Sequence, residues 1–449
     1  MRLSSSTRNR LNAVYRKGGN VVKGKLLRRI AATALCLLAA LPAGCSRAGG
    51  SDKVITFLNS KGEIQGALED VAAAYSKRTG ITVEIIAAPA GTSPFEKISQ
   101  MYTSGNPPTM AMLDTTDMIQ LAESKALELT GEKWVADADD HVYRVDGKVY
   151  SFPMGVEGKG LIYNKTAIEN TLGIVFDPKA YNTYDKLKAL FERLQAKGLT
   201  PVAITKEDWS LGAHLAGFIY ESQSEETGEV DGFIASLPSG REALAQNKRF
   251  QQFMDTFDLL LQYNYYKADP LAADYAVDPS YLTDGDVAFW FNGNWAWPNL
   301  EAFLIGLPVQ PELGMMPLPL GNDESDFVNS TMIGTGSKQI IIDKVKATPA
   351  QQQAAKDFLN WLVYEEEGQR TMVEDLQMVP AFGNITLEPA DPLGRSLKQY
   401  VDAGRTIFGP MLPSDHWSYV GAYMQKYMAG QTDRAGLAAE IQSYWKSKA

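Results

Sequence analysis

The strongest constraint on the fold is a strand–helix–strand pattern at the start of the main body of the chain. The run VITFL at 54–58 is apolar and partly β-branched, which is typical of a buried strand. It is followed by apolar residues at helical spacing, Ile64, Leu68, Val71 and Tyr75. Gly80 then predicts the end of the helix, and ITVEII at 81–86 a second strand. This order predicts a parallel βαβ unit and therefore an α/β fold.

The same pattern recurs downstream, so we expect two α/β regions. GLIYN at 160–164 and PVAI at 201–204 read as strands, and Gly198 as a helix stop. The helix between the two runs is indicated by Leu187, Leu190, Phe191 and Leu194. The proline-rich run MMPLPLG at 315–321 is predicted to cross between the two regions, and the chain from about Pro349 to be helical.

Charge and cysteine content exclude several classes of partner. The 449-residue chain has a formal charge of −10, but residues 1–44 carry nine Lys or Arg and no acid, which leaves −19 on the remainder. Such an acidic body argues against nucleic acid and against adhesion to anionic lipid by charge. The only cysteines are Cys36 and Cys45, so no disulfide or cysteine metal site is expected in the body. With three scattered histidines, we expect no metal and no cofactor.

The N-terminus predicts export. The run at 30–41 is apolar or small and has the length of a signal-peptide core rather than of a membrane span. It ends in LPAGCS, which resembles the lipobox of bacterial lipoproteins and implies cleavage before Cys45 and a lipid on its sulfur, although Pro42 departs from the usual pattern. An uncleaved anchor, a plain secretory peptide and a start site near Val21 are the alternatives. Residues 46–53 would form a flexible tether.

Several segments resemble the extracellular solute-binding proteins of bacterial ABC importers, in particular the carbohydrate branch that includes maltose-binding protein. They occur in order over nearly the whole mature chain: VITFLNSKGEIQGALEDVAAAYSKRTGITVEI, GNPPTMAMLD, GKVYSFPMGVEGKGLIYNK, FNGNWAWPN, and AAKDFLNWLVYEEEGQ ahead of MVPA. The resemblance implies a monomeric receptor that binds a sugar and is recognised by a membrane permease, on the outer face of the membrane.

The resemblance also implies a type II periplasmic-binding-protein fold, with two lobes, each a sheet flanked by helices, joined by hinge crossovers. The ligand would lie in the cleft, and closure would bring both lobes against it. The expected division is a signal peptide at 1–44, a tether at 45–53, the first lobe at 54–146 and 315–364, and the second lobe at 147–314 and 365–449.

Aromatic side chains are the first candidates for the site, because sugars offer apolar ring faces together with hydroxyl groups. Trp295 in NGNWAW matches the tryptophan on which family members stack sugar. Trp417 in DHWSYV and Trp209 in EDWSLG are similarly placed, although core packing is the alternative for each. The tryptophans expected in the core are Trp290, Trp297 and Trp361.

Polar candidates complete the predicted site. Glu157, in MGVEGKG, is where family members bring a carboxylate to ligand hydroxyls. Asp114 follows a strand at its carboxyl end, as do Asn59, Lys61 and Glu63 in the first strand–helix loop, and this is the usual ligand position in α/β sheets. Solvated loop or surface side chains are the alternative. The first loop is shorter than in maltose-binding protein and lacks its aspartate, and no tryptophan accompanies Asp114, so maltodextrin is not favoured.

Three other functions stay open at this stage. A glycan hydrolase would need two carboxylates flanking the scissile bond, and Glu157 and Asp114 are the candidates. The sequence has no nucleophile-elbow, zinc-protease or P-loop motif that would indicate another enzyme class. A sensory lipoprotein would share the fold and the site. A polyamine receptor would surround its aromatic residues with carboxylates.

Overall fold

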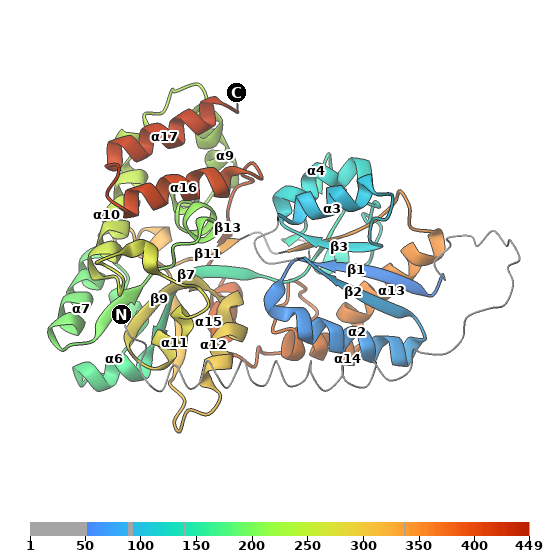
Figure 1. Cartoon of the computed structure of the whole chain (residues 1–449), viewed down its shortest axis with the longest axis horizontal. Coiled ribbons are helices and arrows are strands. Elements are labelled where there is room, and N and C mark those ends of the chain that lie inside the picture. Colours follow the sequence, from blue (N-terminus) through green and yellow to red (C-terminus); the bar gives the residue numbers. More distant parts are fainter. Residues whose placement is uncertain (1–51, 89–92, 139–140, 336–337, 449) are drawn as a thin grey trace, which may run out of the picture.

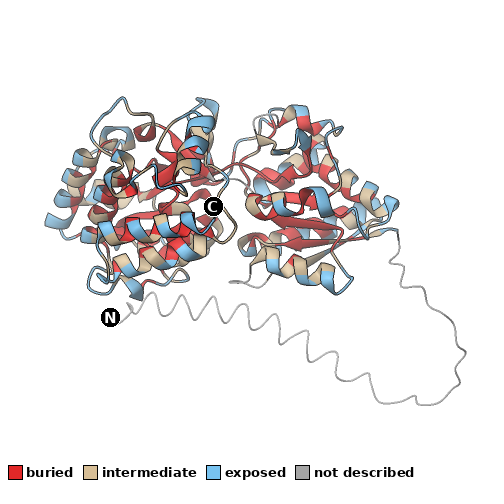
Figure 2. Ribbon diagram, turned by 90° about the horizontal axis from the view of Figure 1, so that it is seen from above, coloured by how far each residue is buried: buried red, intermediate tan, exposed pale blue. Residues whose placement is uncertain are grey.

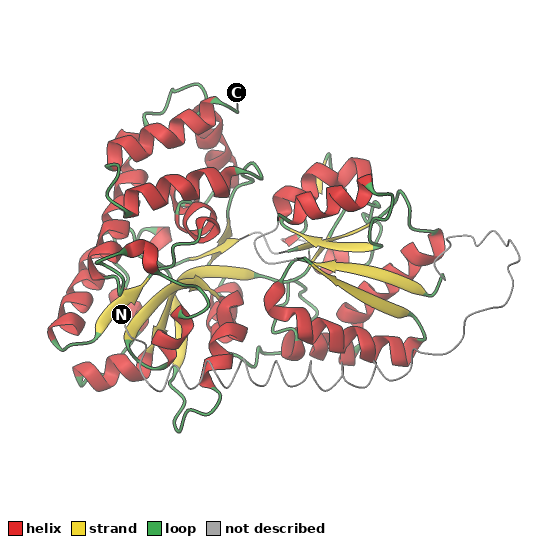
Figure 3. Ribbon diagram, viewed as in Figure 1, coloured by secondary structure: helices red, strands yellow, loops and turns green. Residues whose placement is uncertain are grey.

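The computed structural model describes residues 52–88, 93–138, 141–335 and 338–448. These residues form two lobes that lie side by side, each built around its own β-sheet with helices packed on it (Figures 1 and 3). In both lobes the sheet is buried and the outer helix faces are exposed (Figure 2). The predicted signal peptide, Cys45 and nearly all of the tether lie outside the described residues.

The first lobe is built on a sheet with strand order β2-β1-β3-β12-β6. Its strands are β1 Val54–Asn59, β2 Thr82–Ala87, β3 Met110–Leu113, β6 Phe152–Pro153 and β12 Gln339–Ile342. A separate hairpin pairs β4 Arg144–Val145 with β5 Lys148–Val149. Its helices are η1 Gly62–Ile64, α2 Gln65–Thr79, α3 Pro94–Thr103, α4 Thr115–Lys125, α5 Trp134–Asp137, α13 Pro349–Tyr364, α14 Glu366–Arg370 and η9 Thr371–Asp375.

The second lobe is built on a sheet with strand order β13-β11-β7-β9-β8, with β10 also paired to β7. Its strands are β7 Glu157–Asn164, β8 Thr200–Ala203, β9 Val287–Gly293, β10 Leu313–Met316, β11 Met332–Thr335 and β13 Thr406–Phe408. Its longer helices are α6 Lys165–Leu172, α7 Tyr184–Ala196, α9 Thr227–Ser236, α10 Lys248–Tyr263, α12 Trp297–Leu304, α15 Pro392–Asp402, α16 His416–Met428 and α17 Arg434–Lys446. The shorter ones are η3 Pro178–Tyr181, η4 Ser210–Leu215, α8 Phe218–Glu221, η5 Leu244–Gln246, η6 Pro270–Ala272, α11 Asp278–Thr283, η7 Asn294–Ala296 and η8 Phe327–Asn329.

The predicted βαβ unit is confirmed. Strand β1 runs parallel to β2, with Phe57 opposite Ile85, and α2 connects the two strands. The helix ends at Gly80, whose φ of 75° is a left-handed conformation that favours glycine. The second predicted helix is α7, with all four of its expected apolar residues buried.

The chain crosses between the lobes later than predicted at each point. Strand β6 pairs with β12 of the first sheet, so the first crossing lies between Pro153 and Glu157 and not at 147. Strands β10 and β11 both pair with β7, so residues 315–335 belong to the second lobe. The prediction that MMPLPLG crosses between the lobes is therefore wrong, because Met316, Leu318 and Leu320 pack in the core of the second lobe. Helices α14 and η9 pack with α13 and α2 in the first lobe.

Backbone hydrogen bonds join the crossings to one another. The amide of Met154 donates to the carbonyl of Lys338 at 2.9 Å, and that of Val156 to the carbonyl of Val379 at 2.8 Å. A Cβ at Gly155 would lie 2.9 Å from the same Val379 carbonyl oxygen, so the strands approach too closely for a side chain there. The lobes are thus connected by a narrow ribbon, the form a hinge takes.

The two largest clusters of buried apolar residues correspond to the two lobes. One large cluster of buried apolar residues fills the second lobe, and another fills most of the first and continues past the hinge to the base of β9 and α12. The three tryptophans expected in the core are buried there: Trp290, Trp297 and Trp361. Among the helices of the described residues, none combines the length and the apolar character that crossing a bilayer requires.

Candidate functional site

The site lies where one edge of each sheet faces the other lobe. In the first sheet this edge holds the carboxyl ends of β1 and β3 and, because β12 is antiparallel to β3, the start of β12. In the second sheet it holds the carboxyl ends of β8, β9 and β13 and, because β7 is antiparallel to β9, the start of β7. All of the predicted site residues lie on these loops and strand ends, apart from Trp417 on α16.

Three of them form an ion cluster, which we call the Lys61 triad. The Lys61 ammonium lies 2.5 Å from a carboxylate oxygen of Glu157 and 2.8 Å from one of Glu63. Lys61 and Glu63 belong to the loop after β1 in the first lobe, and Glu157 is the first residue of β7 in the second. The lysine side chain is only 3% exposed, so the two carboxylates replace the water that its charge has lost.

The charges of the triad stabilise one another. Burial alone would lower the pKa of Lys61, but the carboxylates of Glu157 and Glu63 raise it well above its usual value. Burial alone would raise the pKa of Glu63, but the Lys61 ammonium lowers it. Lys61 and Glu63 therefore keep their charges at neutral pH, and such charges can orient the hydroxyl groups of a ligand.

Asn59 shapes the loop that carries the triad. Its side-chain carbonyl accepts from the amide of Lys61 at 2.9 Å, and its amide donates to the Lys61 carbonyl and to Gln65, both at 2.8 Å. The side chain is buried and occupied by these bonds. The structure thus shows Asn59 as a residue that positions Lys61.

Asp114 lies beside the triad and is paired. Its carboxylate is 2.5 Å from the ammonium of Lys338, which comes from the second crossing between the lobes. The charge of Lys338 also acts on Glu63 in the first lobe and on His214 in the second, so this lysine lies between the two lobes. Burial, followed by the nearby charge of Asp114, raises the pKa of Asp117 to about 7.

Facing these charges from the second lobe is a group of four rings, the aromatic set: Trp209, His214, Tyr275 and Trp295. The His214 ring centroid lies 4.6 Å from that of Trp295 and 5.4 Å from that of Trp209. Trp209 in turn lies 5.1 Å from Tyr275 in an edge-to-face arrangement. Both tryptophans are partly exposed, whereas the tryptophans of the core are buried. The charges of Glu63 and Lys61 act on Tyr275, so this ring lies within electrostatic reach of the triad.

The π-helical turn η4 gathers the three predicted tryptophans. Trp209 directly precedes it, His214 within it contacts Trp295, and a Cβ at Gly212 would meet the backbone of Trp417 at 2.0 Å. Glycine at 212 thus lets the backbone of α16 at Trp417 approach η4 closely. Single π-helical turns are frequent at functional sites because they shift side chains out of the regular helical register.

Gly293 and Asn294 fix the position of Trp295. A Cβ at Gly293 would lie 2.2 Å from the Trp295 ring, so the indole folds back over the glycine. The side-chain carbonyl of Asn294 accepts from the amide of Gly158 at 2.9 Å, which ties this turn to the start of β7 next to Glu157. The sequence NGNW therefore places an indole and a carboxylate at the same sheet edge.

The electrostatic state of His214 is set by its surroundings. Burial and then the charges of Lys159 and Lys338 hold its pKa well below the usual range, so the ring is neutral at physiological pH. Its Nδ1 is buried and forms no hydrogen bond within the described part of the chain. A neutral imidazole packed edge-to-face on Trp209 and tilted against Trp295 adds apolar surface to the aromatic set.

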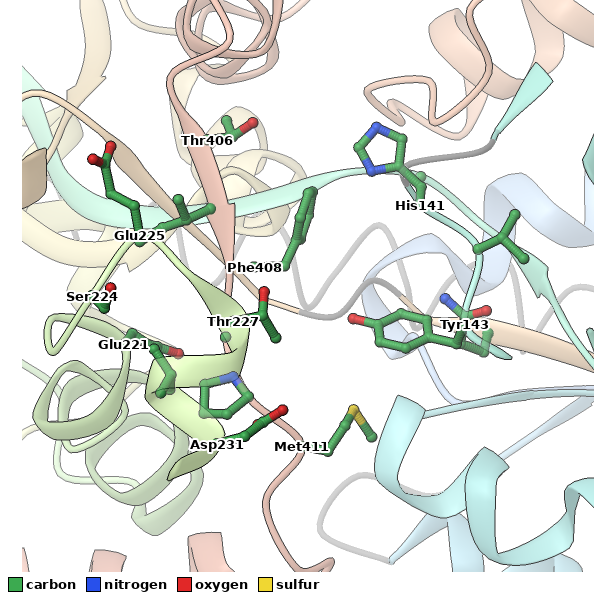
Figure 4. A pocket seen from close by; sticks show the side chains of 17 residues that line it. His141, Tyr143, Glu221, Ser224, Glu225, Thr227, Asp231, Thr406, Phe408 and Met411 are labelled. Atoms are coloured by element: carbon green, nitrogen blue, oxygen red, sulfur yellow. The ribbon is translucent and has the colours of Figure 1, made fainter. Parts of the chain in front are cut away.

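An interlobe cavity of about 450 Å³ lies farther along the same edge, at the end of β13. His141 and Tyr143 line it from the first lobe, and Phe408, Thr227 and Asp231 from the second (Figure 4). The rings of His141 and Phe408 meet across it with centroids 5.1 Å apart. The cavity is therefore bounded by both lobes, as a closing cleft requires.

Glu221, which lines the interlobe cavity, belongs to a buried ion pair. The ammonium of Lys159 on β7 lies 2.8 Å from both carboxylate oxygens of Glu221, and both residues are buried. Burial lowers the pKa of Lys159 and raises that of Glu221, while their mutual attraction opposes both shifts. A Cβ at Gly409 would lie 2.5 Å from Glu221, so the residue after β13 packs on this pair.

Sequence reasoning missed His214, Tyr275 and Lys338. Each lacks a local pattern: His214 is a single histidine in an apolar turn, and Lys338 one of many lysines. Tyr275 lies in a loop of ordinary composition between η6 and α11. Only their contacts with predicted residues across the fold identify them. Within the described ranges, no cluster of His, Cys, Asp and Glu is arranged to hold a metal ion.

The chain matches a known protein family and a known relative over most of its length. The profile of the family described as "Bacterial extracellular solute-binding protein" matches residues 70–393. The multiple sugar-binding protein of Streptococcus mutans is 25% identical over 402 residues, which cover 82% of this chain and 87% of that protein.

Two solved structures share the fold. The solute-binding protein RafE in complex with raffinose superposes with a TM-score of 0.73 at 18% identity and covers 88% of this chain and 99% of its own. A family 1 extracellular solute-binding protein from Bifidobacterium longum subsp. infantis gives a TM-score of 0.61 at 21% identity, with coverage of 88% and 99%. The type II two-lobed fold expected from the sequence is thereby confirmed.

Proposed function

Because the chain belongs to the family of bacterial extracellular solute-binding proteins, we propose that it captures a carbohydrate between its lobes and presents it to an ABC importer. The observation that carries the sugar assignment is the meeting of two complementary surfaces. The aromatic set and the Lys61 triad come together at the start of β7, where Asn294, next to Trp295, accepts from the amide of Gly158, next to Glu157. Indole faces suit the C–H faces of a sugar ring, and fixed charges suit its hydroxyl groups.

The relatives support the same assignment. The Streptococcus mutans protein is named for binding multiple sugars, and RafE was solved with raffinose. In this chain, Trp295, Trp209 and Glu157 would contact the ligand, with Trp417 beside them. The interlobe cavity at Phe408 lies along the same sheet edge and would take further units of an oligosaccharide.

Closure supplies the signal for the importer. A ligand that touches both lobes stabilises the closed form by the contacts it makes only there. The narrow ribbon at Met154–Val156 and its partners leaves the lobes free to move as bodies. The permease would then recognise the closed arrangement.

We propose binding without chemical change. Glu157 and Asp114, the pair that a hydrolase would need, are each held by a lysine, Lys61 and Lys338 respectively. Carboxylates engaged in such pairs, on lobes that move, are poorly suited to act as acid and nucleophile on one bond. Incubation with a glycan panel should yield no cleaved product.

A thermal-shift screen against mono- and oligosaccharides tests the proposal. A ligand at about 100 times its dissociation constant should add about 2.7 kcal/mol to the free energy of unfolding. Trp295→Ala should abolish this gain without unfolding the protein. As a matched control, Tyr419→Ala removes an exposed ring that packs on Tyr444 and should leave the gain intact. An unchanged shift in the Trp295 variant would remove that residue from the site.

A further inference from the structure

A second concave site lies on the second lobe, in a groove between β10 and α15. Its volume of about 840 Å³ exceeds that of the interlobe cavity. Tyr163 lines it from β7, six positions along the strand from Glu157, which corresponds to about 20 Å. The groove is therefore separate from the proposed sugar cleft. We call it the β10–α15 groove.

The rim of the β10–α15 groove is basic, although the protein body is acidic. Lys179, Arg395 and Arg405 line it and are exposed. No carboxylate of a described residue forms an ion pair with any of the three. Arg395 donates to the backbone carbonyls of Pro389 and Ala390, and its charge also acts on Asp391 without forming an ion pair. In the described lining, Glu312 is the single acid, and Lys165 neutralises it at 2.7 Å. Cations left unpaired around one hollow favour an anionic ligand.

Aromatic rings and amides line the same groove. Tyr163, Tyr400 and Trp297 contribute ring surface. Burial raises the pKa of both tyrosines to about 12, helped by Glu312 and Asp177 at Tyr163 and by Tyr163 and Asp177 at Tyr400. Their hydroxyls therefore stay protonated and can donate hydrogen bonds. The side-chain amides of Gln310 and Gln399 line the groove and form no hydrogen bond with other residues that the structure describes. Rings combined with free planar amides are the features that suit a sugar.

We infer that the β10–α15 groove is a second ligand site, which takes a sugar that bears a carboxylate or a phosphate. The sugar ring would lie against Tyr163 and Tyr400, and its acidic group would meet Arg405 and Lys179. This site does not depend on the interlobe cleft, since it is lined by the second lobe and the segment that joins α15 to it.

Calorimetry with the purified protein tests the inference, using a galacturonic acid trimer, its uncharged methyl ester and glucose 1-phosphate as probes. We expect the trimer or the sugar phosphate to bind and the ester to bind at least about tenfold more weakly. Arg405→Gln and Lys179→Gln should each lower the affinity for the acidic probe about tenfold, because each removes a charged hydrogen-bond donor. Lys197→Gln, an exposed charge change outside the groove, should have no effect.

Several results would overturn the inference. It would be overturned if the acid and its ester bound equally, or if neither acidic probe bound. It would also be overturned if neither Arg405→Gln nor Lys179→Gln changed the affinity for the acidic probe. Trimer binding must persist in Trp295→Ala, since its loss would place the trimer in the cleft. Retention on phosphatidylglycerol vesicles without binding of the free probes would instead indicate a membrane contact, because Ile305 and Val309 are exposed on the loop beside the groove. These outcomes are independent of the neutral-sugar screen.

Discussion

Lys61 and Glu157 are joined by a 2.5 Å ion pair between the lobes, although 96 residues separate them in the chain. The lysine is almost fully buried and has Glu63 as its second partner. A buried ammonium has lost its water, and the two carboxylates compensate its charge instead. Removing either carboxylate would leave part of that buried charge uncompensated, which destabilises the fold. With the ligand contact proposed for Glu157, the pair would link stability and binding at one position.

Glu157→Gln should lower both stability and affinity. The amide keeps the shape of the side chain but removes one of the two charges that hold Lys61, so we expect a loss of about 1–3 kcal/mol in the free energy of unfolding. Chemical denaturation measures the first effect and ligand titration the second. Glu312→Gln is the matched control, because its exposed pair with Lys165 should contribute less than about 1 kcal/mol. Equal losses in the two variants would contradict a special role for the triad.

Gly293→Ala should displace the ring of Trp295. The new methyl group would occupy the space that the indole fills at 2.2 Å, while the extended backbone at this residue accepts alanine without strain. We expect ligand affinity to fall about tenfold or more and the intrinsic tryptophan fluorescence to change. Gly232→Ala in α9 is the control, since nothing lies within 4 Å of that Cβ and a helical alanine should add about 0.5–1 kcal/mol of stability. Unchanged affinity in the first variant would separate Trp295 from binding.

Cys45→Ala should release the protein from the membrane. Two acyl chains on this cysteine would hold the protein stably, and the tether alone has no means to do so. In cell fractionation we expect the variant in the soluble exported fraction and the parent with the membrane. Cys36→Ala, inside the predicted signal peptide, should leave the parent's distribution unchanged. Membrane retention of the Cys45 variant would favour the uncleaved anchor.

Local patterns predicted the elements of the fold well. The spacing of Leu68, Val71 and Tyr75 depends only on the helix period, and Gly80 ends the helix because it accepts a positive φ. The predicted burial of Trp290 and Trp361 is likewise confirmed. Each of these features is decided within a few residues.

Long-range pairing was harder to predict, as the lobe boundaries show. Ile333 of β11 pairs with Lys159, and Ile340 of β12 with Met112, so two consecutive short strands join different sheets. Nothing local in MMPLPLG distinguishes a strand that stays in the second lobe from one that crosses. The aromatic set has the same character, because His214 and Tyr275 become site residues only by contacting tryptophans far away in the chain.

His416 predicts how stability depends on pH. The ring is buried, with Nε2 2.9 Å from the hydroxyl of Tyr220, and burial lowers its pKa to about 3 despite the opposing charge of Asp415. In the unfolded chain this pKa is about 6.5. Between these values the unfolded state binds a proton that the folded state excludes. The contribution to stability is therefore complete above pH 6.5 and is lost as the pH falls, at about 1.4 kcal/mol per pH unit.

Comparison of the parent with His416→Gln isolates this effect. Glutamine can keep a hydrogen bond to Tyr220 but does not titrate, so the parent should lose about 1 kcal/mol more than the variant between pH 7.5 and pH 5.5. Asp117 and Asp278, whose pKa values burial raises to about 7, give the opposite slope but are present in both proteins and cancel in the difference. Urea denaturation at several pH values measures the gap. A gap that stays constant with pH would show that His416 does not control acid sensitivity, and that the folded ring accepts its proton as readily as the unfolded one.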